Sequence, residues 1–326
     1  MISKIKFENT NKKTYRIKKI LIILTFEANM NSANDIEWQV KGILPNTKIP
    51  ELSEITNEIR YAITTKTFDT KQWVEKIESD QTFAKNLSLI YEKKYYTGQT
   101  PINSINQAIQ RLGYEGFWCI VLENALNDTF YENQSYPEWI PALDFLHKYG
   151  LWMAHLCRII ARNTAVPSHE AFQAGLLQNI GRVIALREQE YKKRYNELQG
   201  MWDAISLVHP LIGTYAVRIW GLDKNIQRSI LNQGQVNFNN KPHVLSAILV
   251  LAQNLLSKMG KECSGPANWV DKNSIPSSQS TLHNDIPIVP TATFEDALQV
   301  LDLESKDINS IGKEFAETLK TLNLLH

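Results

Sequence analysis

The stretch from Ser168 to Gly221 constrains the fold of this chain most, because it carries two apolar stripes at helical spacing. Ser168 is a favourable helix cap, and large apolar residues then follow on one face: Phe172, Leu176, Ile180 and Val183. At roughly 100° per residue, Asn179 lies within about 20° of Phe172, so its side chain is predicted to point at the core. The stretch therefore begins with a buried helix that carries a polar side chain on its inner face.

A second buried helix is predicted to open at His209-Pro210, because proline is favoured at the first helical position. Gly221 is well placed to end this helix. Its inner face is formed by Ile212, Tyr215, Ala216, Ile219 and Trp220. The two helices are expected to pack against each other through these faces, with Leu176, Ile180 and Ile212 nearly fully buried.

The segment GLLQNIG, from Gly175 to Gly181, resembles the GLLHDIG signature of the HD superfamily, helical phosphohydrolases named for a metal-binding His-Asp pair. The spacing to His209 and to the following Trp-Gly-Leu is similar to that of one branch, the HDOD domain. Where an HD enzyme has His-Asp, this chain has Gln178-Asn179. A neutral amide cannot supply the negative charge on which a divalent cation site relies. The resemblance therefore implies an HD-like fold whose metal site is lost.

Two upstream segments extend the resemblance. The segment PINSINQAIQRLGYEGF, residues 101–117, resembles an HDOD hallmark, and it includes a predicted capping box at Ser104 and Gln107 and a helix end at Gly113. The segment IESDQTFAKNLSLIYEKKYY, residues 77–96, is similar to a helix-turn-helix unit of the same family. The resemblance covers roughly residues 43–258.

We therefore predict an all-α protein, a multi-helix HD-like bundle with an N-terminal helical lobe. The expected parts are an HDOD domain at 34–260, with an N-terminal lobe at about 43–127 and an HD-like lobe at about 139–258, a linker at 261–292 and C-terminal helices at 293–326 that pack on the body. Residues 1–33 are expected to be a disordered arm or a mis-assigned gene start. A signal peptide is the third alternative, but the basic segment at the start is longer than in most signal peptides. Their apolar run, Ile20 to Leu24, is too short to span a membrane.

The net charge and the cysteines indicate which kinds of partner and which compartment to expect. Thirty-five basic and 34 acidic residues give a net charge of +1, which provides no general attraction to nucleic acid or to a membrane surface. The three cysteines have neither metal-like nor disulfide-like spacing, which fits a reducing cytoplasm. We expect a cytoplasmic protein without a membrane span, whose partner is a protein in a signalling pathway or a small ligand.

The resemblance also indicates which chemistry to expect. Of the positions at which HD enzymes place metal ligands, only His209 keeps a ligand-type side chain, and Gln233-Gly234 stands where relatives often have a His-His pair. We expect no metal and no cofactor. Gln178, Asn179, His209 and Gln233 are predicted to form a vestigial polar pocket, which either satisfies its own hydrogen bonds or reads a small ligand.

Two histidines lie on the preceding predicted helix, from about Ala142 to Asn163. We expect His147 and His155 to be partly exposed on an amphipathic helix, although a displaced catalytic role stays open for either. The sequence thus predicts a non-catalytic signal-transduction or regulatory HDOD protein that binds a partner. The alternative is a metal-dependent phosphohydrolase of the HD superfamily with a displaced site.

Overall fold

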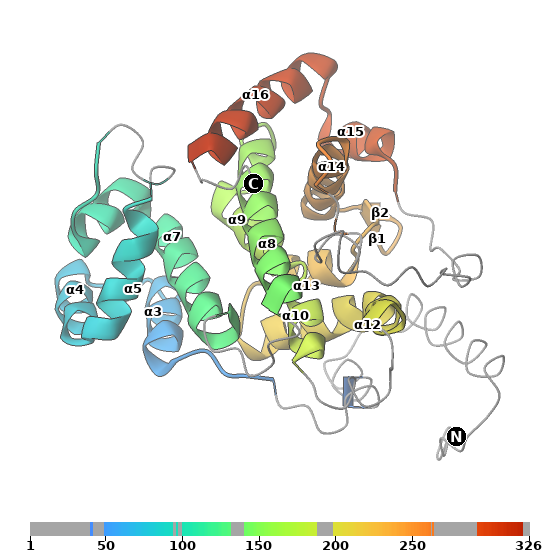
Figure 1. Cartoon of the computed structure of the whole chain (residues 1–326). Coiled ribbons are helices and arrows are strands. Elements are labelled where there is room, and N and C mark those ends of the chain that lie inside the picture. The colour runs from blue at the N-terminus through green and yellow to red at the C-terminus, as the bar shows by residue number, and fades with distance from the viewer. Residues whose placement is uncertain are drawn as a thin grey trace. The chain divides into compact units, whose positions relative to one another are not determined.

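The structure, a computed structural model, describes residues 40–41, 49–93, 96, 100–131, 140–187, 198–261, 263 and 292–321 (Figure 1). Within these ranges the regular elements are helices and one two-stranded hairpin, so the all-α prediction is confirmed. Described residues after Thr47 belong to one compact unit, and Val40 and Lys41 belong to a separate N-terminal unit. The predicted arm at 1–33 and most of the predicted linker lie outside the described residues.

The described helices of the larger unit follow one another in chain order. They are α3 (Glu54–Thr64), α4 (Thr70–Ser79), α5 (Gln81–Tyr91), α7 (Ile105–Leu126), the π-helical turn η1 (Asn127–Tyr131), α8 (Ile140–Ala161), α9 (Ser168–Leu177), α10 (Ile180–Leu186), α12 (Leu198–Ile219), α13 (Lys224–Leu231), α14 (Val244–Lys258), α15 (Phe294–Leu301) and α16 (Ser305–Thr321). The hairpin pairs β1 (Asn237–Phe238) with β2 (Lys241–Pro242).

The first three helices begin at side-chain caps. Ser53, Asp69 and Asp80 each accept a hydrogen bond from a backbone N–H three residues later, at 3.4, 2.9 and 3.0 Å respectively. Each bond satisfies one of the donors that a helix start leaves without an intrahelical partner. Leu89 of α5 is an exception to the apolar core, because its side chain is 58% exposed.

Helix α7 shows a partial capping box. Ser104 Oγ accepts the Gln107 N–H at 3.2 Å, but the Gln107 side chain accepts the Asn103 N–H at 2.9 Å instead of that of Ser104. The predicted reciprocal bond is therefore shifted by one residue. Gly113 interrupts the helix with φ of 71°, where the sequence predicted a helix end.

Two predicted helix starts are wrong. Pro167 occupies the cap position of α9 and its carbonyl accepts the Glu170 N–H at 3.0 Å, so Ser168 is the first helical residue. Helix α12 starts at Leu198, and Pro210 lies inside it. A proline there removes one backbone bond, but the turns before it bury Trp202 and Ile205, and that burial favours continuing the helix.

Helix α8 lies at the centre of the larger unit. It packs against α9, α14 and α16, and Figure 1 shows these helices around it. The last two helices contact this body through apolar side chains that are buried: Ala297, Leu301, Ile311, Phe315 and Leu319. Lys258 of α14 also lies 3.4 Å from the ring centre of Phe294, a cation–π contact that joins α14 to α15.

The hairpin between α13 and α14 was not predicted. It is two residue pairs long and turns through Asn239 and Asn240, both with positive φ. Asparagine tolerates this conformation better than other residues with side chains, which explains why it serves as the turn. The hairpin strands are not buried, so they do not alter the helical core. No helix in the described part of the chain is long and apolar enough to cross a bilayer.

Candidate functional site

Gln178 and Asn179 lie at a break between two helices, not within one continuous helix. Helix α9 ends at Leu177 and α10 begins at Ile180, with Asn179 at φ −101° and ψ 6° between them. Both amide side chains are buried. The break places these two polar residues in the interior, as the spacing of the apolar stripe predicted for Asn179.

The glycines on either side of the break allow close helix packing. A Cβ atom on Gly181 would lie 1.9 Å from the carbonyl oxygen of His209 on α12, which is impossible without backbone movement. A Cβ on Gly175 would lie 2.6 Å from the Met153 carbonyl oxygen on α8. The two glycines therefore bring the amide pair against α12 on one side and α8 on the other.

Gln178 is held by two other glutamines. Gln253 Nε2 on α14 donates to Gln178 Oε1 at 2.9 Å, and Gln233 Nε2 donates to the Gln178 backbone carbonyl. Gln178 Nε2 is buried with no hydrogen-bond partner among the described residues. Two of the four predicted site residues, Gln178 and Gln233, are thus in direct contact.

Asn179 is bound to an arginine that the sequence analysis did not single out. Arg182 Nε, one turn further along, donates to Asn179 Oδ1 at 3.0 Å, and Arg182 Nη1 donates to Ser206 Oγ on α12. The guanidinium lies 4.4 Å from the ring centre of Trp202. Asn179 Nδ2 points to Cys263 Sγ at 3.8 Å. Arg182 therefore ties α10 to α12 through a charged hydrogen bond and a cation–π contact.

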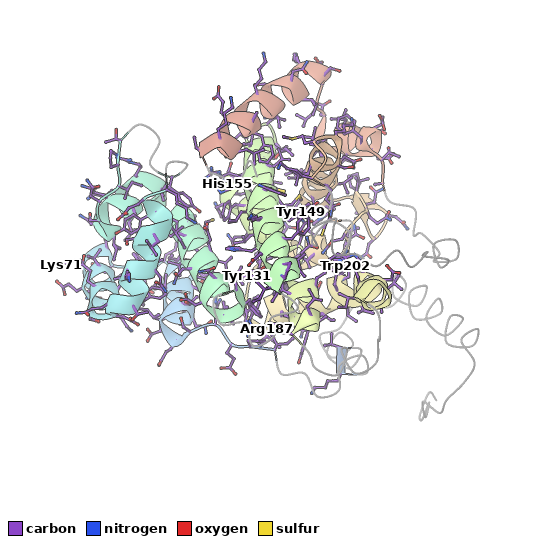
Figure 2. All side chains as sticks on the ribbon, in the orientation of Figure 1. Lys71, Tyr131, Tyr149, His155, Arg187 and Trp202 are labelled. Atoms are coloured by element: carbon purple, nitrogen blue, oxygen red, sulfur yellow. The ribbon has the colours of Figure 1, made fainter. Side chains whose placement is uncertain are left out.

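The charge of Arg182 affects its neighbours. Burial lowers the pKa of Arg182, while Cys263 and Tyr149 act in the opposite direction. Burial raises the pKa of the Cys263 thiol, which Arg182 and Asn179 partly offset. Tyr149 lies on α8 and Trp202 lies on α12 (Figure 2). The residues that act on the Arg182 guanidinium therefore come from separate parts of the sequence.

His209 is only 3% exposed and lies on α12 one residue before Pro210. Burial, followed by the charge of Arg182, moves the pKa of His209 well below its ordinary value, so the ring is neutral at pH 7. His209 Nδ1 has no hydrogen-bond partner among the described residues. His209 thus belongs to the same polar cluster as Arg182, although no direct bond joins it to Gln178 or Asn179 within that part of the chain.

Of the two histidines of α8, His147 is partly exposed as predicted and His155 is not. His155 is fully buried, with its ring 6.2 Å from that of Tyr96 and 5.2 Å from that of Phe172, and burial moves its pKa well below the ordinary value. His147 is half-buried and stacks on Tyr131 at 4.3 Å. The prediction failed for His155 because α8 is enclosed on more sides than an amphipathic surface helix would be.

The sequence analysis missed Arg182, Gln253 and Cys263. Arg182 could have been found, because it lies three residues after Asn179 and helical neighbours at that spacing share a face. Gln253 and Cys263 gave no local signal. They reach the cluster only because α14 packs against α9 and the chain after α14 returns to Asn179.

The described residues do not fit a divalent metal ion at this place. The side-chain oxygen of Asn179 accepts a hydrogen bond from the Arg182 guanidinium, and the side-chain oxygen of Gln178 accepts one from Gln253. Among the described residues, no three His, Cys, Asp or Glu side chains gather as metal ligands need to. A fixed guanidinium beside the amide pair also repels a second cation.

Comparisons with solved structures agree on the fold. A candidate phosphohydrolase from Shewanella amazonensis is 14% identical with a TM-score of 0.59, over 91% of this chain and 97% of its own. An HDOD domain protein of unknown function from Geobacter sulfurreducens is 17% identical with a TM-score of 0.57, over 86% and 97%. A candidate signal transduction protein from Marinobacter aquaeolei is 16% identical with a TM-score of 0.57, over 97% and 65%.

These likenesses show the fold of the chain, a bundle of helices. The sequence profile of the HDOD domain matches residues 49–236, more than half of the chain. The chain therefore belongs to the HDOD domain family. A search of curated protein sequences finds no match.

Proposed function

We propose that this protein is a non-catalytic signal-transduction or regulatory protein, which acts by binding a partner protein or a small ligand. One observation carries the proposal. Asn179 stands where the HD signature has its metal-binding aspartate, and its Oδ1 atom accepts a hydrogen bond from Arg182 at 3.0 Å. The acceptor position of the vestigial site is thus used by a cation that the chain itself supplies.

Charge explains why this arrangement suits a binding protein better than a metal-dependent hydrolase. Such a hydrolase needs anionic ligands that hold a divalent ion and a bound water with a lowered pKa. Here the ligand pair is neutral, the nearest charge is positive, and His209 is a single imidazole. Restoring one ligand would leave both the charge and the coordination number too low for a stable metal site.

The names of the structural relatives support a regulatory role only in outline. One is named as a signal transduction protein and another as a phosphohydrolase, so relatives of the same fold carry both descriptions. Three free thiols, Cys119, Cys157 and Cys263, suit the reducing cytoplasm, where we propose that the protein acts. The hydrolase with a displaced site is the alternative that an experiment has to exclude.

Metal content and turnover test the proposal together. Purified protein is incubated with Mn²⁺, Fe²⁺, Mg²⁺ or Zn²⁺, dialysed and analysed for bound metal, and then assayed with a generic phosphodiester and a cyclic dinucleotide. We expect no stoichiometric metal and no turnover above the buffer rate. About one metal ion per chain, together with turnover that a chelator abolishes, would refute the proposal.

Restoration variants provide the matched control. A double variant, Gln178→His/Asn179→Asp, rebuilds the HD pair while Arg182 remains. A triple variant adds Arg182→Met to these two changes. We expect the double variant to bind Mn²⁺ no better than the wild type, and the triple variant to bind it measurably. Equal metal binding by both variants would show that Arg182 does not exclude the ion.

A further inference from the structure

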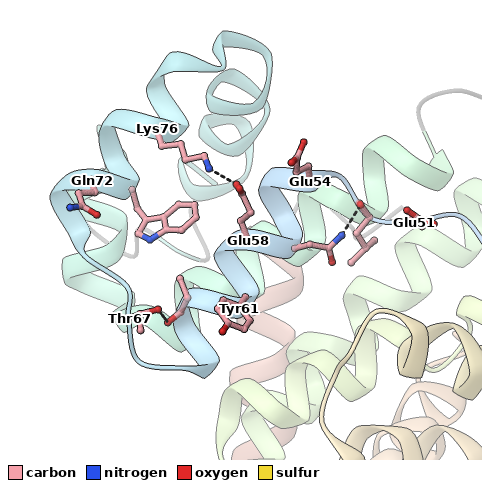
Figure 3. Close-up of a pocket in the computed structure, with 11 residues that line it drawn as sticks. Glu51, Glu54, Glu58, Tyr61, Thr67, Gln72 and Lys76 are labelled. Atoms are coloured by element: carbon pink, nitrogen blue, oxygen red, sulfur yellow. Dashed lines mark hydrogen bonds and ion pairs between the residues drawn. The ribbon is translucent and has the colours of Figure 1, made fainter. Parts of the chain in front are cut away.

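An open groove lies on the N-terminal helices, formed by residues 51–76 and therefore outside the polar cluster around Asn179. It runs between α3 and α4, has a volume of about 860 Å³, and is open to solvent (Figure 3). Its lining includes the apolar side chains of Leu52 and Ala62, both buried, and the aromatic side chains of Tyr61 and Trp73. We refer to this feature as the α3–α4 groove.

The aromatic residues of the groove are placed for contact with a partner. Tyr61 is 64% exposed, so its ring is accessible to a partner. Trp73 is half-buried and stacks on Phe68 at 5.4 Å with the rings nearly parallel. A side chain fixed in this way loses little entropy on binding, and tyrosine and tryptophan are the residues most enriched at binding hot spots.

The backbone below the groove is also fixed. Asn57 Nδ2 donates to the Leu52 carbonyl at 2.9 Å, and the Trp220 indole N–H donates to the Pro50 carbonyl at 2.8 Å. These bonds anchor the segment that enters α3 to the helix itself and to α12. The groove is therefore pre-formed and does not have to be built when a partner arrives.

The charge of the groove is negative. Its lining includes Glu51, Glu54, Glu58 and Lys76 (Figure 3). Lys76 forms an ion pair with Glu58 and lies 5.2 Å from the Trp73 ring centre, so these two charges balance each other. Glu51 and Glu54 form no ion pair with any described residue. Two carboxylates without an ion-pair partner among the described residues thus line the same groove as two aromatic rings.

We propose that the α3–α4 groove binds a short segment of a partner protein in which lysine or arginine flanks an aromatic or apolar side chain. The basic side chains would pair with Glu51 and Glu54, and the apolar one would pack on Tyr61 and Trp73. The open shape suits a polypeptide better than a small molecule, since small-ligand sites bury most of their ligand. The carboxylates disfavour phosphate-bearing ligands. This inference rests on the proposed function, because it names the chemistry of the partner.

A displayed library of random twelve-residue peptides tests the proposal, with the full-length protein as bait at about 0.15 M salt. Peptides are first removed on the variant Glu51→Lys/Glu54→Lys and then selected on the wild type. We expect the enriched sequences to carry lysine or arginine next to an aromatic or apolar residue. Synthetic versions should bind the double variant about tenfold or more weakly, and Tyr61→Ala should weaken binding comparably.

The variant Glu295→Lys/Glu317→Lys is the matched control. It makes the same charge change, with Glu295 in the first turn of α15 as Glu54 is in the first turn of α3, and both residues are exposed. Helical circular dichroism confirms that every variant is folded. No enrichment, enrichment of acidic or purely apolar peptides, or an equal loss of binding in the control would each overturn the proposal. None of these outcomes changes the metal and turnover result, so the two proposals fail separately.

Discussion

At the scale of single residues, the site differs from an HD centre chiefly in the source of its positive charge. A metal ion is held by ligands and can dissociate, whereas Arg182 is covalently part of α10. Its guanidinium is planar and donates in fixed directions, which matches the amide oxygen of Asn179 and the hydroxyl of Ser206. The polar cluster can therefore hold α10 to α12 without a bound ion.

Buried neutral histidines predict a pH dependence of stability. The pKa of both His155 and His209 is well below the ordinary value, because burial and nearby cations (Arg158 and Lys93 for His155, Arg182 for His209) oppose protonation. In the unfolded chain each has a pKa of about 6.5, so below that pH the unfolded state binds more protons than the folded one. Stability is therefore full above about pH 6.5 and falls as the pH decreases.

The expected loss is about 1.4 kcal/mol per pH unit for each histidine that stays neutral when folded. Urea unfolding between about pH 7.5 and 5.5 measures it, in a range where surface carboxylates stay largely ionised. The variant His155→Phe/His209→Gln should show a shallower slope, whereas the control Leu176→Ala, which removes no titratable group, should keep the wild-type slope. Parallel slopes in all three proteins would mean that these rings are protonated in the folded state.

At the scale of elements, the contact between α8 and α9 is the most extensive in the described chain. Leu176, in the last turn of α9, is buried. Leu176→Ala should lower the free energy of unfolding by about 2–5 kcal/mol, because it removes apolar burial and leaves a cavity. Urea denaturation measures the change. A loss below about 1 kcal/mol would place α9 at the surface.

A sequence predicts the end of a helix well where that end depends only on residues close by in the chain. Asp69 and Asp80 mark helix starts because a carboxylate and a backbone N–H three residues later interact whatever the rest of the chain does. The start of α12 and the break between α9 and α10 could not be predicted in this way. The first depends on burial of Trp202, and the second on the close approach of Gly181 to His209, which are tertiary contacts.

The candidate site follows the same division. Gln178, Asn179 and His209 were found from a motif, which fixes neighbours along the chain. Gln253 and Cys263, the partners of Gln178 and Asn179, lie on or after α14, 75 and 84 residues further along the chain, and no local pattern connects them to the motif. A motif therefore locates such a site, but only the packing of the helices shows which residues its amide side chains contact.

At the scale of the whole larger unit, the N-terminal helices and the HD-like helices share polar contacts as well as a core. Trp118 on α7 donates to Gln173 on α9 at 3.1 Å, and both residues are buried. Arg60 on α3 donates to the Gly221 carbonyl at 2.9 Å, where Gly221 ends α12 with φ of 65°. The two sets of helices are thus joined by polar contacts between two different pairs of segments.

These contacts predict that the two sets of helices unfold together. A buried indole that lost its amide partner would be left without a hydrogen bond, which costs about 1–3 kcal/mol, so partial unfolding of either set is disfavoured. Tryptophan fluorescence and far-ultraviolet circular dichroism should therefore give coincident urea transitions. Gln173→Leu, which removes the acceptor of Trp118, is the variant in which the transitions should separate first. Two resolved transitions in the wild type would show that the sets fold independently and that the Trp118–Gln173 bond does not couple them.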